Sequence, residues 1–105
     1  MTDRTAGYLG LAMRSGSVFV GAGKAAEAVT RGKAGLVVID ALAAENTTKK
    51  LIACCRSNGT PCCILQAGTL GPAIGRVGVY AAALLPGELT RRIAQACADN
   101  IDQSQ

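Results

Sequence analysis

Four consecutive apolar residues, Leu36-Val37-Val38-Ile39, place the tightest limit on how this 105-residue chain folds. A strand that is apolar at every position suits a sheet covered on both faces, because neither face is left for water. A second apolar run, from Pro61 to Leu65, has the same character. Helical patterns that end at glycine lie between such runs, so helices and strands alternate along the chain. This order predicts one α/β/α domain, with a sheet sandwiched between helices.

The expected elements follow from periodicity and from capping residues. We expect helices over about 3–14, 21–31, 47–56, 70–74 and 88–100, and strands over 17–20, 36–39, 61–65 and 76–84. Asn46 and Thr69 are expected to cap the third and fourth helices through their side chains. Helical spacing turns two sets of residues inward, Tyr8, Leu11, Ala12 and Ser15 in the first helix and Ala22, Ala25, Ala26 and Val29 in the second. Residues 1–100 are expected to form the domain, with a frayed tail at 101–105.

The charge and the absence of histidine limit the possible functions. Eleven Lys and Arg against seven Asp and Glu give a net charge of +4, which suits a polyanion such as RNA. Without His there is no Ser-His-Asp triad and no His-containing metal site. Paired carboxylates and an activated nucleophile are not evident either, so we expect no enzyme and no cofactor. Short apolar stretches and an N-terminus without signal-peptide features predict a cytoplasmic protein with no membrane partner.

Five cysteines are the other unusual feature of the composition. An odd number in an intracellular chain favours free thiols over disulfides. Cys54-Cys55 and Cys62-Cys63 are adjacent pairs, and the two side chains of such a pair diverge on a helix or a strand. Zinc clusters usually need C-x-x-C spacing, so we expect buried thiols and no metal site. One member of each pair can still meet the other across a helix–sheet contact.

The segment Gly21-Ala22-Gly23-Lys24 is the main candidate for ligand binding. It fails the Walker pattern, because Val18 stands where the first glycine belongs and Ala25 follows the lysine. It also lacks the dinucleotide-binding G-x-G-x-x-G. A glycine turn that opens a helix still exposes N–H groups at the positive end of the helix dipole, which favours anions.

The polar outer face of the next helix can be interpreted in two ways, as a ligand-binding surface or as an ordinary solvated face. Gly23 allows close approach of a ligand, Lys24 and Arg31 can reach phosphates, and Glu27 can accept hydrogen bonds from base amino groups. The alternative is an ordinary solvated face with a Lys24–Glu27 pair.

Other polar residues have weaker functional signals. Asp40 ends a buried strand, where we expect a capping or turn role. The loop Gln66-Ala67-Gly68-Thr69 also follows a strand, and it would form a cradle of backbone donors if it lay beside Gly21–Gly23. The pairs Lys49-Lys50 and Arg91-Arg92, and Arg56, are expected to be solvated charges.

Several segments taken together resemble one known family. They are Leu9-Gly10-Leu11-Ala12-x-Arg14-x-Gly16, Gly21, Arg31-Gly32-Lys33-Ala34-x-Leu36-Val37-Val38-Ile39, Glu45-Asn46-Thr47-x-Lys49-Lys50-Leu51, Cys55, Pro61 and Leu70-Gly71-x-Ala73-Ile74-Gly75-Arg76. In this order they resemble the kink-turn RNA-binding ribosomal proteins of the L-seven-Ae and L-thirty-e family, in particular its small bacterial YlxQ-type branch. The resemblance covers roughly residues 6–85. It implies a three-layer α/β/α sandwich with a central mixed, mostly buried four-stranded sheet.

The resemblance also implies binding to RNA kinked at tandem G·A pairs. The family's motif G-x-N-E-x-x-K falls on the turn and helix start at Gly21–Glu27, and Arg31 and Lys33 correspond to flanking phosphate contacts. A second loop, matching Leu65 to Thr69, would cover a flipped-out nucleotide. Here Gly23, Lys24 and Glu27 replace the family's Asn, Glu and Lys, so the charges are inverted. Loss of the Asn removes a base contact worth ~1–3 kcal/mol of discrimination.

These observations predict a non-catalytic RNA-binding protein, a monomer whose partner is a structured, ribosomal or kink-turn-containing RNA, with ribosome-associated proteins as further partners. The predicted contact residues are Gly21, Ala22, Gly23, Lys24, Glu27, Arg31, Lys33, Leu65, Gln66, Ala67, Gly68 and Thr69. The alternative is a protein-interaction module on the same fold. Salt distinguishes them, because phosphate-driven binding weakens steeply with ionic strength and an apolar interface does not.

Overall fold

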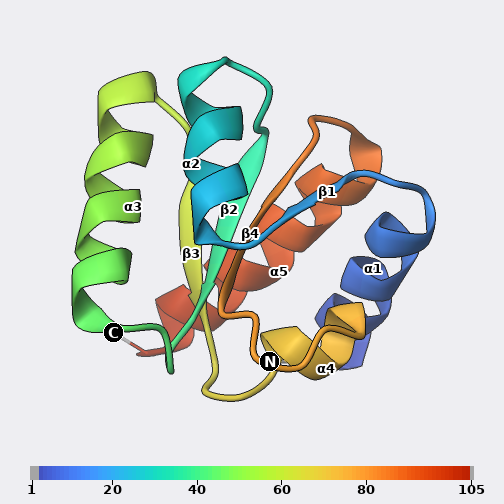
Figure 1. Ribbon diagram of the computed structural model, residues 1–105. Coiled ribbons are helices and arrows are strands. Elements are labelled where there is room, and N and C mark those ends of the chain that lie inside the picture. The colour runs from blue at the N-terminus through green and yellow to red at the C-terminus, as the bar shows by residue number, and fades with distance from the viewer. Residues whose placement is uncertain (1–2, 105) are drawn as a thin grey trace.

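A computed structural model describes residues 3–104 of the chain, with side chains for residues 4–97. Helices and strands alternate along it (Figure 1). In chain order they are α1 (Asp3–Arg14), β1 (Val18–Val20), α2 (Ala22–Thr30), β2 (Leu36–Asp40), α3 (Glu45–Asn58), β3 (Cys62–Leu65), α4 (Leu70–Ile74), β4 (Ala81–Leu84) and α5 (Glu88–Ser104). No helix in this part of the chain is long and apolar enough to cross a membrane.

The four strands form one mixed sheet in the order β1-β4-β2-β3, which confirms the predicted fold class. β4 runs antiparallel to β1 and β2, whereas β2 and β3 are parallel. The register pairs Val20 with Ala82, Ile39 with Ala81 and Asp40 with Leu65. The carboxyl ends of β1, β2 and β3 and the start of β4 therefore lie at one end of the sheet. We call this the Asp40 end; segments 21–24, 41–44, 66–69 and 75–80 meet there (Figure 1).

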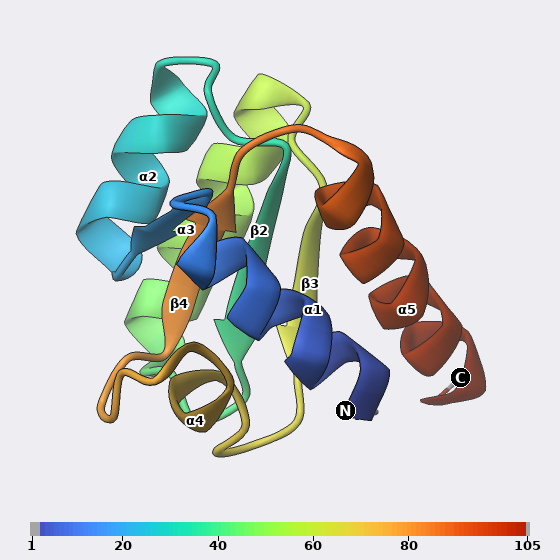
Figure 2. The ribbon, with the colours of Figure 1, turned by 90° about the vertical axis from the view of Figure 1, so that its right-hand side faces the viewer.

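Helices cover both faces of the sheet (Figure 2). Val37 and Ile39 of β2 face the α2–α3 side, while Leu36 and Val38 face the side of α1, α4 and α5. All four side chains are buried, which is why β2 is apolar at every position. The neighbouring strand β4 is almost entirely alanine, and α2 packs directly on it. Small side chains there let the helix backbone approach the sheet closely.

Three expected elements differ from the structure. The strand expected over 76–84 is confined to Ala81–Leu84, because Gly75 and Gly78 adopt φ of 70° and 86° and make segment 75–80 a loop. β3 is an edge strand, so Ile64 is 43% exposed where a buried strand was expected. α3 starts at Glu45 after Ala44, which places Asn46 inside the first turn and not at the cap.

Two helices also differ in detail. In α1 Ala12 is buried and Tyr8 is half-buried against the core, as expected, but Thr5 and Leu9 complete the buried stripe and Leu11 and Ser15 are exposed. The cause is the position of α4 and α5, which pack against the Leu9 side of the helix. Helical backbone in α5 continues through residues 101–104, where a frayed tail was expected. Residue 105 lies outside the described part.

All five cysteines are free thiols. Cys55 of α3 and Cys62 of β3 lie together on the α2–α3 side of the sheet, as the adjacent pairs allowed. Burial raises the pKa of the Cys55 thiol to about 12, and the neighbouring Cys62 adds to the rise. On the other face Cys63 of β3 lies beside Cys97 of α5. Neither arrangement brings together three metal-ligating side chains within the described residues.

Candidate nucleic-acid interface

Gly21 makes the turn that starts α2 at the Asp40 end. Its φ of 100° and ψ of 154° are accessible essentially to glycine alone. The Gly21 N–H donates to Ala81 O at 2.9 Å, and the Gly21 carbonyl accepts the first helical bond from Ala25 N at 2.9 Å. No side chain caps the helix, and the backbone N–H groups of residues 22–24 make no hydrogen bond within the described chain. Free donors at a helix start are suited to an anion.

The outer face of α2 is exposed as predicted, but its ion pair differs. Arg31 Nη1 lies 3.8 Å from Glu27 Oε1, and both side chains are more than half exposed. An exposed ion pair of this kind contributes little to the stability of the fold. The Arg31 guanidinium nevertheless offsets the negative charge of Glu27, and Glu27 pairs with Arg31 where a pair with Lys24 was expected. Lys24 and Lys33 are exposed and form no ion pair among the described residues.

Asp40 organises the neighbouring loops through its buried carboxylate. Oδ1 accepts hydrogen bonds from Leu42 N at 2.8 Å and Gly68 N at 2.9 Å, and Oδ2 accepts one from Leu70 N at 3.0 Å. The predicted capping or turn role of Asp40 is therefore confirmed, because its carboxylate holds the turn at Leu42 and the first residue of α4, Leu70. Thr69 does not cap α4 with its side chain, because its hydroxyl donates to Gln66 O at 2.6 Å.

The pKa of Asp40 reflects this environment. Burial alone would raise it, but the backbone N–H groups of Leu70, Leu42, Gly68 and Thr69 together outweigh burial and hold the pKa below its usual value. The carboxylate is thus charged at neutral pH and keeps the loop 66–69 fixed against β2.

The two predicted binding segments share the Asp40 end but do not adjoin. Gly21 follows β1 at one edge of the sheet and Gln66 follows β3 at the other, with β4 and β2 between them. Three strand spacings amount to about 14 Å. Residues 66–68 are exposed and Thr69 is half-buried, whereas the side chain of Leu65 is buried in the core.

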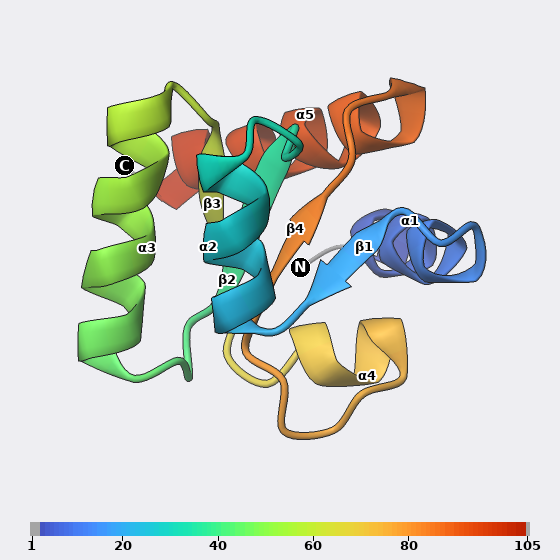
Figure 3. The same cartoon turned by 45° about the horizontal axis from the view of Figure 1, so that its top comes forward.

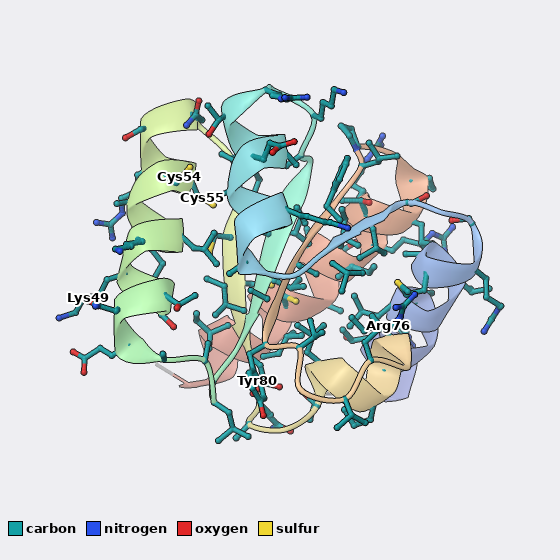
Figure 4. All side chains as sticks on the ribbon, viewed as in Figure 1. Lys49, Cys54, Cys55, Arg76 and Tyr80 are labelled. Atoms are coloured by element: carbon teal, nitrogen blue, oxygen red, sulfur yellow. The ribbon has the colours of Figure 1, made fainter. Side chains whose placement is uncertain are left out.

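Segment 75–80 lies between the two, and sequence reasoning missed it. Tyr80 is 41% exposed at the Asp40 end, and its carbonyl accepts a hydrogen bond from Asp40 N at 2.8 Å (Figure 4). Val77 is 95% exposed. The available signal was the pair of glycines, Gly75 and Gly78, which favours a turn over the strand that was expected. The exposed side chains at this end thus include Lys24 in the segment after β1 and the apolar Val77 and Tyr80 in segment 75–80.

This fold and this surface define a small α/β/α domain with a cation-flanked helix start at one end of its sheet. The chain belongs to the ribosomal protein L7Ae/L30e/S12e/Gadd45 family, whose sequence model matches residues 3–90. No match is found among the curated proteins.

Two solved structures show the same fold. One is a protein of unknown function from Bacillus halodurans C, with 26% identity and a TM-score of 0.85 over 93% of this chain and 99% of that chain. The other is the Giardia lamblia 15.5kD RNA binding protein, with 21% identity and a TM-score of 0.77 over 95% of this chain and 86% of that chain.

Replacing Gly21 with alanine should destabilise the fold, because the turn holds a φ of 100° that an L side chain rarely adopts. We expect a loss of about 1–3 kcal/mol in the free energy of unfolding, measured by urea denaturation. Gly23→Ala is the matched control. Gly23 is helical and a Cβ there meets nothing within 4 Å, so this change should be neutral or stabilising. Equal effects of the two substitutions would contradict the assignment.

Asp40→Asn should destabilise the protein at pH 7 by about 2–3 kcal/mol, since charge-assisted hydrogen bonds are lost. A depressed pKa means that the folded state binds the proton more weakly than the unfolded state. The stabilisation from Asp40 is therefore complete above the unfolded pKa of about 3.9 and is lost as pH falls through the lower folded value. Urea denaturation at pH 7 and pH 3 measures both effects. A variant as stable as the wild type at pH 7 would refute this role.

Proposed function

We propose that this chain is a non-catalytic RNA-binding protein that contacts structured RNA through the turn and helix start at residues 21–27. The observation that carries the proposal is the uncapped start of α2. Its free N–H groups adjoin Lys24, whose ammonium has no ion-pair partner among the described residues. Phosphate oxygens are the ligand that matches both features.

The kink-turn resemblance guides the choice of RNA. The family's Asn and Glu are replaced by Gly23 and Lys24, so base-edge contacts give way to backbone donors and a phosphate-binding cation. Glu27 stands where the family has Lys, but its charge is compensated by Arg31 at 3.8 Å. These features favour retained affinity for a kinked RNA, with more of the binding energy supplied by phosphate contacts.

The proposal extends to the wider surface and the cellular setting. Lys33 would contribute a flanking phosphate contact, and Gln66 to Thr69 would contact RNA further along the Asp40 end. Binding of this kind requires no cofactor. We place the protein in the cytoplasm as a monomer on ribosomal or kink-turn-containing RNA, with ribosome-associated proteins as further partners.

One observation favours a protein-interaction module instead. Leu42, Val77 and Tyr80 expose apolar surface in loops at the Asp40 end. Apolar side chains of this kind also serve protein interfaces. Ionic strength separates the two, because only a phosphate-dominated interface loses affinity steeply as salt is added.

A direct test titrates the protein with a kink-turn RNA and with the same RNA lacking its tandem G·A pairs, by fluorescence anisotropy at ~0.15 M salt. We expect tighter binding to the intact kink, by a modest factor because the Asn contact is missing, and a steep loss of affinity as salt rises. Equal affinity for the two RNAs would refute kink recognition. No binding to either would refute the RNA proposal and leave the protein-interaction alternative.

Lys24→Glu tests the location of the interface. Reversing this charge beside the free N–H groups should weaken RNA binding about tenfold. The slope of log affinity against log salt concentration should fall by about 1–2, which corresponds to the loss of one or two phosphate contacts. Arg91→Glu is the matched control, since Arg91 is also exposed but lies on α5, which covers the other face of the sheet. Equal losses from the two reversals would indicate a net-charge effect and contradict the assigned site.

A further inference from the structure

The edge strand β3 carries two adjacent cysteines that face opposite sides of the sheet. Cys62 lies on the α2–α3 side and contacts Cys55 of α3. Cys63 lies on the other side and contacts Cys97 of α5. Figure 3 shows β3 between these two helices. Each face of this strand therefore has a pair of thiols at its contact with a helix.

The two pairs differ in their access to solvent. Cys63 and Cys97 are 5% and 2% exposed and belong to the core on the side of α1, α4 and α5. Cys55 is also only 2% exposed, but its partner Cys62 is half-buried at the edge of the sheet. A small solute can therefore reach Cys62 in the folded protein, whereas the second pair is enclosed.

The turn between α3 and β3 holds the accessible pair in place. Gly59 ends α3 with a φ of 67°, in the left-handed region, and Thr60 N donates to Cys55 O at 2.9 Å. The Pro61 carbonyl accepts a hydrogen bond from Val37 N at 3.0 Å, which fixes the start of β3 on β2. Because the backbone is hydrogen-bonded on both sides of the turn, the fold itself keeps the two thiols in contact.

Cys54 shows that this contact is specific to one cysteine of α3. It is half-buried like Cys62, but its Sγ lies 3.8 Å from Thr30 Oγ1 and 4.0 Å from Ala26 O, both in α2. Adjacent side chains on a helix point in different directions, so Cys54 contacts α2 and Cys55 contacts β3 (Figure 4). The partners of Cys54 are thus oxygen atoms, whereas the partner of Cys62 is a thiol.

Within the accessible pair, Cys62 ionises more readily than Cys55. Burial, with a smaller contribution from Cys62, raises the pKa of the Cys55 thiol to about 12. Burial also raises the pKa of Cys62, but a hydrogen bond from the Cys55 thiol opposes this rise. Because the thiolate is the nucleophilic form of cysteine, the sulfur that solvent reaches is also the more reactive of the two.

We propose that Cys55 and Cys62 form a reversible disulfide when the protein meets an oxidant of the hydroperoxide class. With hydrogen peroxide, the Cys62 thiolate attacks one oxygen: an S–O bond forms, the O–O bond breaks, and hydroxide leaves and takes up the proton that Cys62 released. The Cys55 sulfur then attacks the Cys62 sulfenic acid, so that an S–S bond forms and the S–O bond breaks. The oxygen leaves as water with the Cys55 proton. Two thiols are thereby oxidised by two electrons, and one peroxide is reduced to two waters.

The disulfide closes residues 55–62 into a covalent loop and ties the edge strand to α3. A crosslink stabilises a protein mainly by restricting its unfolded chain. We expect the oxidised protein to melt about 5 °C or more above the reduced protein. In a reducing compartment such a bond is transient, which is the usual character of a disulfide that responds to oxidants. This modification is independent of RNA binding.

Peptide mapping identifies the pair that reacts. The protein is treated with hydrogen peroxide at about pH 8.5, near the ordinary pKa of a thiol, and is then alkylated in denaturant and digested with trypsin. Cleavage after Lys and Arg places the five cysteines in peptides 51–56, 57–76 and 93–105. We expect a link between 51–56 and 57–76 that dithiothreitol removes. A link between 57–76 and 93–105 in its place, or alkylation of all five cysteines, would overturn the proposal.

Two serine substitutions test the assignment within the linked peptides. Cys62→Ser should abolish both the link and the rise in melting temperature, whereas Cys54→Ser should retain both. The two changes are matched, since each replaces a half-buried thiol with a hydroxyl, and circular dichroism checks that both variants fold. A link that survives Cys62→Ser, or that is lost in Cys54→Ser, would refute the pairing of Cys55 with Cys62.

Discussion

The buried carboxylate of Asp40 is the interaction on which the proposed binding end of this molecule depends. It fixes three backbone N–H groups, those of Leu42, Gly68 and Leu70, and it does so at the end of a strand that is buried at every position. The backbone continues this connection across the sheet: Asp40 N donates to Tyr80 O, and Gly21 N donates to the next carbonyl, that of Ala81. The Gly21 turn, the segment before β4 and the loop after β3 are thus held in one hydrogen-bonded frame.

Small side chains set the position of the helix that this frame presents. β4 is Ala-Ala-Ala-Leu, and Ala25 and Ala28 of α2 are buried against the same side of the sheet. Close packing of this kind places α2 directly on the sheet, while its outer face remains exposed. Because Gly21 fixes the turn and Gly23 removes bulk from the first helical residues, a ligand can approach the backbone itself. The site is consequently built from donors of the main chain with lysines at its sides.

The sequence predicted the parts of the fold in which local pattern and tertiary packing agree. The continuous apolar run of β2, the polar outer face of α2 and the capping role of Asp40 all follow from local pattern. The predictions fail where the burial of a residue depends on a neighbouring strand or helix that is distant in sequence. Ile64 is exposed because β3 lies at an edge, and the inward face of α1 is fixed by helices far away in sequence. The separation of residue 21 from residue 66 depends on strand order, which local pattern does not contain. Two glycines in segment 75–80 were the signal that a strand assignment overlooked.

An interface of free backbone donors and unpaired lysines at the Asp40 end is the central claim of this account. Mapping amide chemical-shift changes by NMR, as a kink-turn RNA is added to the isotopically labelled protein, tests it most directly. We predict that the largest changes fall at Gly21, Gly23, Lys24 and Gly68, with those along the described part of α5 near zero. Changes confined to α1 and α5, with none at the start of α2, would contradict it.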